Sequence, residues 1–275
     1  MRFFRCVSLV IGFWALPVHA DGDCGWPSPC EVEGGQYLAQ TPSDWDGEAS
    51  LPVVVFFHGW SSSAEAMMKS QRLVDAILGG GALFVAPDGV RGGSGRKSWS
   101  HVGSPARNRD ELPFIDAVIA DVTKRWPTSA NRMLIAGFSQ GGSMVWDVAC
   151  YRGARYGRYL SFSGGFWDPL PEDCPAGPVD LLHFHGTADT VVPMEGRPLG
   201  GRRHQGDILE GMKRWHAANS CPATPQDQQN LGVLACDVWD DCEAGRLKLC
   251  IHDGGHEFQA RWLRREVEAL AEGTG

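Results

Sequence analysis

The segment RMLIAGFSQGGSM, residues Arg132 to Met144, is the most informative part of this chain. Four apolar residues lead into Gly137, and Ser139 stands between that glycine and Gly141. A sharp turn from a strand into a helix needs glycines beside its apex, because the apex residue adopts an uncommon backbone conformation and its neighbours pack closely. Such a turn lifts the serine hydroxyl to the helix N-terminus, where the dipole favours negative charge. An ordinary turn fits the pentapeptide equally well in a chain with 35 glycines, so the remaining sequence must decide.

Short apolar runs recur along the chain with helical stretches between them. The runs cover residues 51–57, 82–87, 132–137, 158–163 and 180–185. Short, nearly all-apolar strands that alternate with helices predict a parallel sheet covered on both faces. The expected helices are Ala64 to Leu78, Glu111 to Trp126, Gly141 to Tyr151, Gln205 to Asn219 and Phe258 to Glu272.

Three connecting segments refine this expectation. Residues 233–240 and 246–253 alternate around an acidic, Gly-containing turn and read as a hairpin; pairing Asp240 with Arg246 would place Cys236 opposite Cys250. The loop 88–113 is long for a compact domain, and such loops are often functional. The gap between Ser163 and residue 181 is too short for a large lid domain.

The N-terminus reads as an export signal. Residues 1–20 carry two arginines, a short apolar run and the ending Val18-His19-Ala20, which favours a signal peptide cut after Ala20 over a membrane anchor. No later segment is apolar enough to span a bilayer. Without Arg2 and Arg5 the formal charge moves from −8 to −10, so the mature chain lacks the basic character that nucleic acid or anionic lipid would favour.

The mature chain, residues 21–275, is long enough for one α/β domain with a substantial core. We expect it to be secreted or periplasmic, monomeric and free of cofactors. Of the nine cysteines in the full sequence, Cys6 leaves with the signal peptide, and the eight that remain in an exported chain predict disulfides. Proximity favours Cys24 with Cys30 and Cys150 with Cys174, and the hairpin register favours Cys236 with Cys250.

A serine nucleophile needs a base to take its proton and a third group to orient that base. In a strand–helix fold with this turn, the acid and then the histidine should follow in loops after later strands. Asp189 in HFHGTADTVVP and His256 in CIHDGGHEF occupy those positions. Asp180 would lie at the wrong end of its strand, since ligands bind at the carboxyl edge.

Other residues near the hairpin and the fifth run compete for functional roles. Asp253 reads as a cap at the end of the hairpin, and His252 reads as part of the strand. His183 and His185 could share a metal on one strand face, but no third ligand follows at close spacing. We therefore expect a buried pair with bonded ring nitrogens and no metal.

Two further groups of residues belong to the expected site. The tetrahedral intermediate of acyl transfer needs backbone N–H donors, which Gln140, after the nucleophile, and Trp60, after His58-Gly59, would supply. Trp99, Phe166 and Trp167 fall in loops at the same edge, and we expect them to form apolar walls for the substrate.

The combination FFHGWSSSAEAM, APDGV, GFSQGGSM, HGTADTVVP and DGGHEF resembles the secreted polyhydroxybutyrate depolymerase and feruloyl esterase family of α/β-hydrolases. The resemblance runs from Leu51 to the C-terminus and implies an α/β-hydrolase fold with a Ser139, Asp189, His256 triad. It also implies a disulfide between Cys221 and Cys242. Gln140 after the nucleophile is similar instead to acyl-protein thioesterases and small carboxylesterases.

The leading hypothesis is a secreted serine esterase acting on carboxylic esters, including esters in a polyester or plant wall. The alternatives are a small carboxylesterase or thioesterase, and a non-catalytic binding protein that uses exposed tryptophans on a polymer. A binding protein has no need of a complete triad, because function resides in the site and not in the fold. A peptidase would need an additional gating domain, for which this chain has no room.

Overall fold

The computed structural model describes residues 24–104 and 107–273. The expected signal peptide, residues 1–20, lies outside this part. Within it, no helix combines the length and the apolar character needed to cross a membrane.

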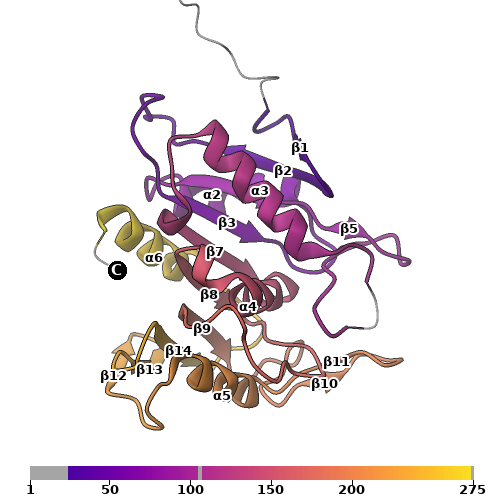
Figure 1. Cartoon of the computed structure of the whole chain (residues 1–275), viewed down its shortest axis with the longest axis vertical. Helices are drawn as coiled ribbons and strands as arrows, with labels where there is room; N and C mark the ends of the chain where they lie inside the picture. Colours follow the sequence, from indigo (N-terminus) through magenta and orange to yellow (C-terminus); the bar gives the residue numbers. More distant parts are fainter. Residues whose placement is uncertain (1–23, 105–106, 274–275) are drawn as a thin grey trace, which may run out of the picture.

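One ten-stranded sheet runs through the whole molecule (Figure 1), in the order β1-β2-β4-β3-β7-β8-β9-β14-β13-β12. The six central strands, β4 through β14 in this order, are parallel, and antiparallel strands extend the sheet at both edges. The sheet strands are β1 Cys30–Val32, β2 Gly35–Gln40, β3 Val53–Phe57, β4 Leu83–Pro87, β7 Met133–Phe138, β8 Arg158–Phe162, β9 Asp180–Gly186, β12 Asp227–Leu231, β13 Leu234–Trp239 and β14 Arg246–His252.

Helices cover both faces of this sheet, so alternate strand residues enter two separate cores. On β3, Val53, Val55 and Phe57 pack in the core that holds α3 Glu111–Arg125, α4 Gln140–Arg152 and α5 Ile208–Asn219. Val54 and Phe56 point to the other core, with α1 Ala64–Met68, α2 Gln71–Ile77 and α6 Ala260–Glu272. Strands buried on both faces explain the nearly all-apolar runs, and the expected α/β-hydrolase architecture is confirmed.

The C-terminal hairpin has the expected register. β13 and β14 pair antiparallel with Cys236 opposite Cys250, and a disulfide joins the two residues. β14 also pairs in parallel with β9 and thereby continues the central sheet. The other disulfides are Cys24–Cys30, Cys150–Cys174 and Cys221–Cys242. Proximity and hairpin register had favoured three of the four pairs, and the family resemblance had implied Cys221–Cys242.

Three helix boundaries were wrong. The expected helix from Ala64 to Leu78 is two helices, because Ser70 adopts an extended conformation and starts α2. Gln205 belongs to a short strand, and α5 begins after Asp207, whose side chain caps the helix by accepting from Glu210 N–H. The last helix begins at Ala260, two residues after the expected start. Short 3₁₀ turns at Ala130–Arg132 and Gly153–Arg155 complete the helical segments.

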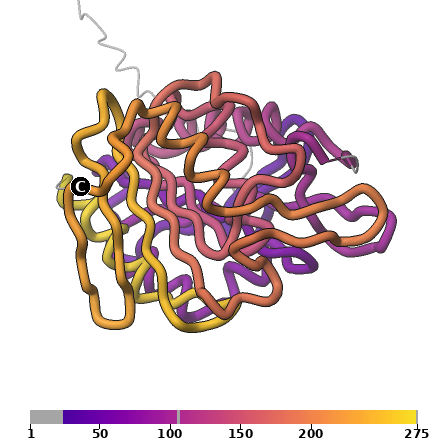
Figure 2. Tube along the Cα trace, turned by 90° about the horizontal axis from the view of Figure 1, so that it is seen from below, coloured from indigo at the N-terminus to yellow at the C-terminus, as the bar shows by residue number. Residues whose placement is uncertain are grey.

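Two small β-ribbons project from the same side of the molecule. β5 Val90–Arg91 pairs with β6 Lys97–Ser98, and β10 Arg197–Pro198 pairs with β11 His204–Gln205. We call them the 90–98 arm and the 197–205 arm. Both arms project to the right in Figure 1, the 197–205 arm below the 90–98 arm, and their ends overlap in the perpendicular view of Figure 2. The 90–98 arm occupies part of the long loop expected at 88–113, whereas residues 163–179, between β8 and β9, contain no helix and no lid domain.

Candidate active site

Ser139 is the residue between β7 and α4, and its backbone is strained. Its φ of 60° and ψ of −124° lie in a region that residues with a side chain rarely adopt. A Cβ on Gly137 would lie 2.4 Å from Gly141 O, and one on Gly141 would lie 2.0 Å from Phe57 O. Both positions therefore require glycine, so the turn in GFSQG is the tight strand-to-helix elbow and not an ordinary turn.

Asp189 and His256 form a hydrogen-bonded pair at the carboxyl edge of the sheet. His256 Nδ1 lies 2.7 Å from Asp189 Oδ2, although the residues are 67 positions apart. Asp189 follows β9 and His256 follows β14, which are neighbouring parallel strands, so their loops meet at one edge. The other oxygen, Asp189 Oδ1, accepts from the N–H groups of Val191 and Val192 at 2.8 Å each.

The environment of Asp189 keeps its carboxylate charged. Burial raises the pKa of this carboxyl, but the hydrogen bonds from His256 and from Val192 N–H outweigh burial, and the pKa lies below its ordinary value. A charged Asp189 accepts from His256 Nδ1–H, which leaves Nε2 without a proton and able to act as an acceptor.

Ser139 and His256 line two different hollows. The His256 ring packs on Phe138, the residue before the serine, with the ring centroids 4.7 Å apart. Ser139 lines a cavity of about 620 Å³, and His256 lines a second hollow of about 610 Å³ next to it. Within the described residues, no hydrogen bond joins the two side chains. The structure thus brings Asp189 and His256 into contact and places Ser139 beside them.

Two backbone N–H groups next to Ser139, those of Trp60 and Gln140, have no protein acceptor among the described residues. Gln140 is the first residue of α4, and Trp60 follows Gly59, where an added Cβ would lie 3.4 Å from Ser139 Cβ. In the described part of the chain, neither Trp60 N–H nor Gln140 N–H donates to a protein group. Both residues line the cavity that holds Ser139.

Trp99 braces the segments that carry these two donors. Its indole Nε1–H donates to His58 O at 2.7 Å, and its backbone N–H and C=O each bond the Gln140 side-chain amide at 3.3 Å. The residue is 3% exposed. Trp99 lines the cavity, and it also holds the His58 and Gln140 segments in place.

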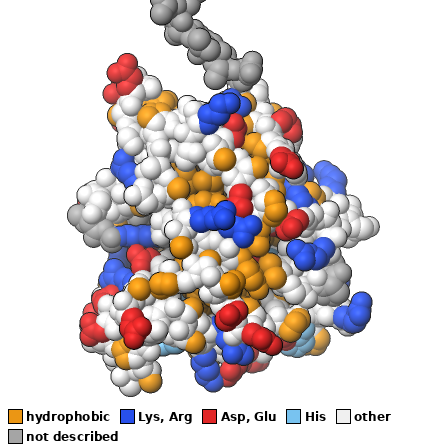
Figure 3. Space-filling model, in the orientation of Figure 1, with side chains coloured by type: hydrophobic (Ala, Val, Ile, Leu, Met, Phe, Trp, Pro, Cys, Tyr) orange, Lys and Arg blue, Asp and Glu red, His pale blue; other side chains and the backbone are white. Residues whose placement is uncertain are grey.

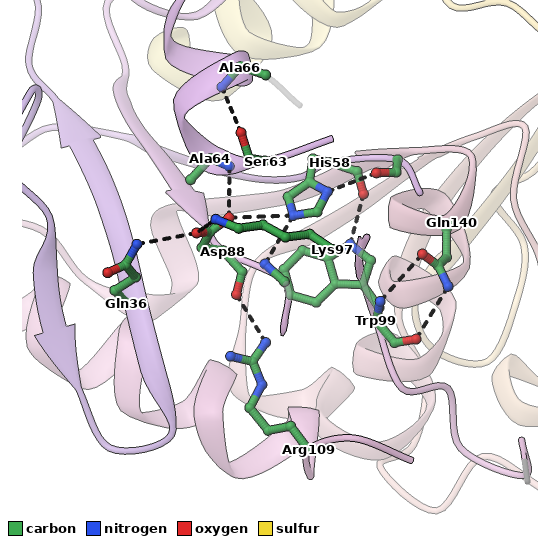
Figure 4. A network of polar contacts seen from close by, with 12 residues as sticks. Gln36, His58, Ser63, Ala64, Ala66, Asp88, Lys97, Trp99, Arg109 and Gln140 are labelled. Atoms are coloured by element: carbon green, nitrogen blue, oxygen red, sulfur yellow. Dashed lines mark hydrogen bonds and ion pairs between the residues drawn. The ribbon is translucent and has the colours of Figure 1, made fainter. Parts of the chain in front are cut away.

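A buried network centred on Asp88 supports the same loop (Figure 4). Asp88 accepts from Ala64 N–H at 3.1 Å and pairs with the Lys97 ammonium. Gly89 N–H donates to His58 Nε2 at 3.0 Å, and His58 Nδ1 lies 2.8 Å from Gly59 O. Burial lowers the pKa of His58, so it is neutral and carries its proton on Nδ1. Sequence analysis missed this network, although Asp88 in APDGV stands directly after a strand.

His183 and His185 form a buried chain of hydrogen bonds. Trp146 Nε1–H donates to His183 Nδ1 at 3.3 Å, His183 Nε2 lies 3.0 Å from His185 Nδ1, and His185 Nε2 lies 2.7 Å from Val192 O. Burial lowers the pKa of both histidines. The expected pair with bonded ring nitrogens is confirmed. No cluster of three metal-binding side chains occurs among the residues that the structure describes.

The aromatic residues expected at the substrate fall into two groups. Trp167 lines the cavity and stacks on His101, with ring centroids 4.8 Å apart. Phe166 does not line the cavity: it is 4% exposed and packs between Trp146 and Trp215 in the core. The prediction for Phe166 was wrong because two helices, α4 and α5, cover it.

The cavity also contains residues that the sequence did not single out. His101 lies beside Trp167, and its Nδ1 is 2.9 Å from Oδ2 of the buried Asp147, whose pKa burial raises. Arg197 and Arg203 of the 197–205 arm line the cavity as well. Nothing in their local sequence distinguishes these arginines from the many others on the surface.

The fold and the site geometry define an α/β-hydrolase with Ser139 at the apex of a tight strand-to-helix elbow. The chain belongs to the Esterase family, described as "Putative esterase", whose model matches residues 36–235. It is a carboxylic ester hydrolase.

Several of the curated relatives are named feruloyl esterases. "Feruloyl esterase B" of Piromyces equi is 26% identical over 236 residues, which cover 80% of this chain and 42% of the relative. "Probable feruloyl esterase C" of Aspergillus niger is 24% identical over 82% of this chain and 78% of its own length. This chain therefore spans less than half of the Piromyces relative.

Solved structures share the fold at low identity. The acetyl xylan esterase from Aspergillus awamori superposes with a TM-score of 0.61 at 12% identity, covering 86% of this chain and 94% of that structure. The Bacillus cereus carboxylesterase gives a TM-score of 0.56 at 11% identity, with coverages of 86% and 93%.

Proposed function

We propose that this chain hydrolyses carboxylic esters through an acyl-enzyme, with Ser139 as nucleophile, His256 as base and Asp189 as the group that orients His256. The observation that carries the proposal is the 2.7 Å contact between His256 and the buried Asp189, at the sheet edge where the strained Ser139 stands. A serine gains a base in this way only when the imidazole is held in one tautomer.

The reaction follows from these positions. Ser139 Oγ attacks the ester carbonyl carbon while its proton passes to His256 Nε2, and the carbonyl oxygen becomes an anion between Trp60 N–H and Gln140 N–H. The bond from carbon to the alcohol oxygen then breaks as His256 returns the proton to that oxygen. Water repeats the sequence and releases the acid. We expect the Ser139–His256 hydrogen bond to form when substrate binds, since catalytic hydrogen bonds are often long without it.

Trp99 makes the oxyanion site rigid in this proposal. Its indole and backbone hold both donor segments, so the N–H groups do not have to reorganise during the reaction. Preorganised donors of this kind contribute about 3 kcal/mol each to the stability of the transition state.

The proposed substrates are esters of bulky or polymeric alcohols with small or aromatic acids. The cavity at Ser139 has aromatic walls from Trp99 and Trp167, and residues 163–179 provide no lid over it. The matched relatives are named for feruloyl esters, which favours plant-wall esters over hydroxyalkanoates for this chain. Four disulfides fit an exported enzyme, and we propose that it acts as a secreted or periplasmic monomer.

Covalent labelling tests the proposal directly. A fluorophosphonate should add one adduct to the wild type, and peptide mass spectrometry should place that adduct on Ser139. Ser139→Ala should take up no label, and Ser129→Ala, which changes an exposed serine that lines neither hollow, should be labelled normally. An adduct on another serine, or full labelling of Ser139→Ala, would refute the assignment.

A further inference from the structure

The charge of the catalytic cavity is opposite to that of the whole chain. The sequence carries a formal charge of −8. Among the described residues, the cavity lining includes no Asp or Glu, but it includes Arg197 and Arg203. A cleft with basic walls in an acidic protein creates a local potential that attracts anions.

Neither arginine has an acidic partner among the residues that the structure describes. Many other arginines of the chain do: Arg109 pairs with Glu111, and Arg152 with Asp116. Asp168 is an acid near the 197–205 arm, but it pairs with His204 and not with an arginine: its Oδ2 lies 2.6 Å from His204 Nδ1. The guanidinium groups of the cavity are thus available to a ligand.

Arg197 is held in a defined orientation. It is half-buried, and its Nε–H donates to Oε1 of the buried Gln205 on the paired strand at 3.2 Å. This bond fixes the guanidinium plane and leaves both terminal nitrogens free. A planar fork of this kind matches the two oxygens of a carboxylate.

Arg203 is exposed near the turn of the same arm. The space-filling view shows basic side chains where this arm projects (Figure 3). The arm therefore presents one oriented guanidinium inside the cavity and another nearer its rim.

The proposed reaction assigns this cavity to one half of the substrate. His256 must return its proton to the alcohol oxygen, so the alcohol leaves on the His256 side. His256 lines the second hollow and is absent from the cavity of Ser139. The acid half of the ester consequently occupies the cavity with the arginines.

We propose that this enzyme prefers esters whose acid half carries a free carboxylate, which Arg197 and Arg203 bind. The inference rests on the proposed function and adds the chemical class of the acyl group to it. A neutral aromatic or aliphatic acyl group still fits the cavity, but it leaves the two guanidinium groups without a partner.

Matched chromogenic esters test this preference. The 4-nitrophenyl hemiester of adipic acid and 4-nitrophenyl hexanoate have the same chain length and differ in the terminal carboxylate, and the Ser139→Ala protein gives the uncatalysed rate for each. We expect the wild type to show a kcat/KM at least about 10-fold higher for the hemiester, with the difference shrinking as salt is added. A third ester, 4-carboxyphenyl hexanoate, places the carboxylate on the alcohol half. Its kcat/KM should not exceed that of 4-nitrophenyl hexanoate.

Charge-neutral variants link the preference to the arm. Arg197→Gln with Arg203→Gln should abolish the preference, so that the ratio of kcat/KM for the hemiester to kcat/KM for 4-nitrophenyl hexanoate falls to about 1. Arg202→Gln is the control: it removes one positive charge from the same arm at an exposed position outside the cavity lining and should keep the wild-type ratio.

Each remaining outcome has one meaning. Equal activity on both hexanoyl-length esters, or a preference for 4-carboxyphenyl hexanoate alone, would overturn the inference and leave the serine esterase intact. A preference that survives in the double variant would overturn the role of the two arginines. A wild type that hydrolyses none of the three esters would refute the proposed function itself.

Discussion

Replacing Asp189 with Asn should lower kcat/KM for 4-nitrophenyl butyrate by about 10⁴-fold. Opposite unit charges on Asp189 and a protonated His256, 2.7 Å apart, attract by about 6 kcal/mol at an effective dielectric constant of about 20. This attraction exists only once His256 holds the serine proton, so its loss falls on the transition state. About 6 kcal/mol corresponds to a factor of about 10⁴ in rate.

The tautomer works in the same direction. The Asn oxygen can still accept from Val191 and Val192 N–H, which now bond Asp189 Oδ1. Its amide N–H₂ would then face His256 Nδ1 and favour a proton on Nε2, where the ring cannot accept from serine. The fold should be retained, because both backbone N–H groups keep their acceptor.

Initial rates with the two proteins, checked by circular dichroism, provide the measurement. Asp253→Asn is the matched control, because Asp253 is exposed in the loop that leads to His256, and its rate should equal that of the wild type. The pKa of Asp189 lies below its ordinary value, so its carboxylate is charged in the wild type at an assay pH of about 8, where the two rates should be compared. A loss smaller than about 10-fold would show that Asp189 does not support the base.

Four other results are expected. Ser139→Ala should lower ester turnover by at least about 10³-fold with an unchanged thermal midpoint, and near-normal turnover would refute the nucleophile. Replacing both Cys236 and Cys250 with Ala removes a disulfide with a sequence separation of 14 and should lower the free energy of unfolding by about 3 kcal/mol. The thermal midpoint should then be about 6–12 °C lower, and an unchanged midpoint would contradict this prediction. Because burial lowers the pKa of His183 and His185, the unfolded chain binds protons below about pH 6.5 that the folded one excludes, and urea midpoints should fall as pH decreases from about 7 to 5; a constant midpoint would argue against neutral buried histidines. Without a lid, 4-nitrophenyl esters should be hydrolysed best with acyl groups of about 2 to 6 carbons, since further CH₂ groups remain uncovered; a maximum at about 12 carbons or longer would reveal a covered channel.

Much of the fold could be predicted because its signals are local. The apolar runs and the two glycines around Ser139 determine strand burial and the elbow within a few residues. Because Ser139, Asp189 and His256 each follow a strand of the predicted parallel sheet, we expected their loops to meet at one edge of that sheet. The 2.7 Å distance between His256 Nδ1 and Asp189 Oδ2 agrees with this expectation. The hairpin register followed from a short turn, which fixes every pair in the two strands.

The strands that the sequence did not predict, β1, β2 and β12, lack such a local signal. β12 has the sequence DQQNL and lies at the sheet edge, mostly exposed, so neither alternation nor an apolar run marks it. β1 and β2 surround a Gly-Gly turn near the N-terminus, and β2 becomes a strand by pairing with β4. Their existence depends on a partner strand, which propensity does not encode.

Side-chain environments were the least predictable part of the site. Phe166 and Trp167 are adjacent in sequence, yet helices α4 and α5 bury Phe166, whereas Trp167 lines the cavity. The Asp88 network joins residues from separate loops, and its members are recognised only once the sheet places them together. Arg197 differs from other arginines because of Gln205 across the arm, a contact set by ribbon register.

The two hollows beside the elbow have no lining residue in common within the described chain. Substitutions in the cavity of Ser139 and substitutions around His256 should therefore contribute additively to the activation free energy, because residues without shared partners rarely couple. Selection for a different acid half of the ester need not change the specificity for the alcohol half. Selection for a different alcohol half need not change the specificity for the acid half. A descendant of this enzyme could change its substrate one half at a time, passing through intermediates that remain active.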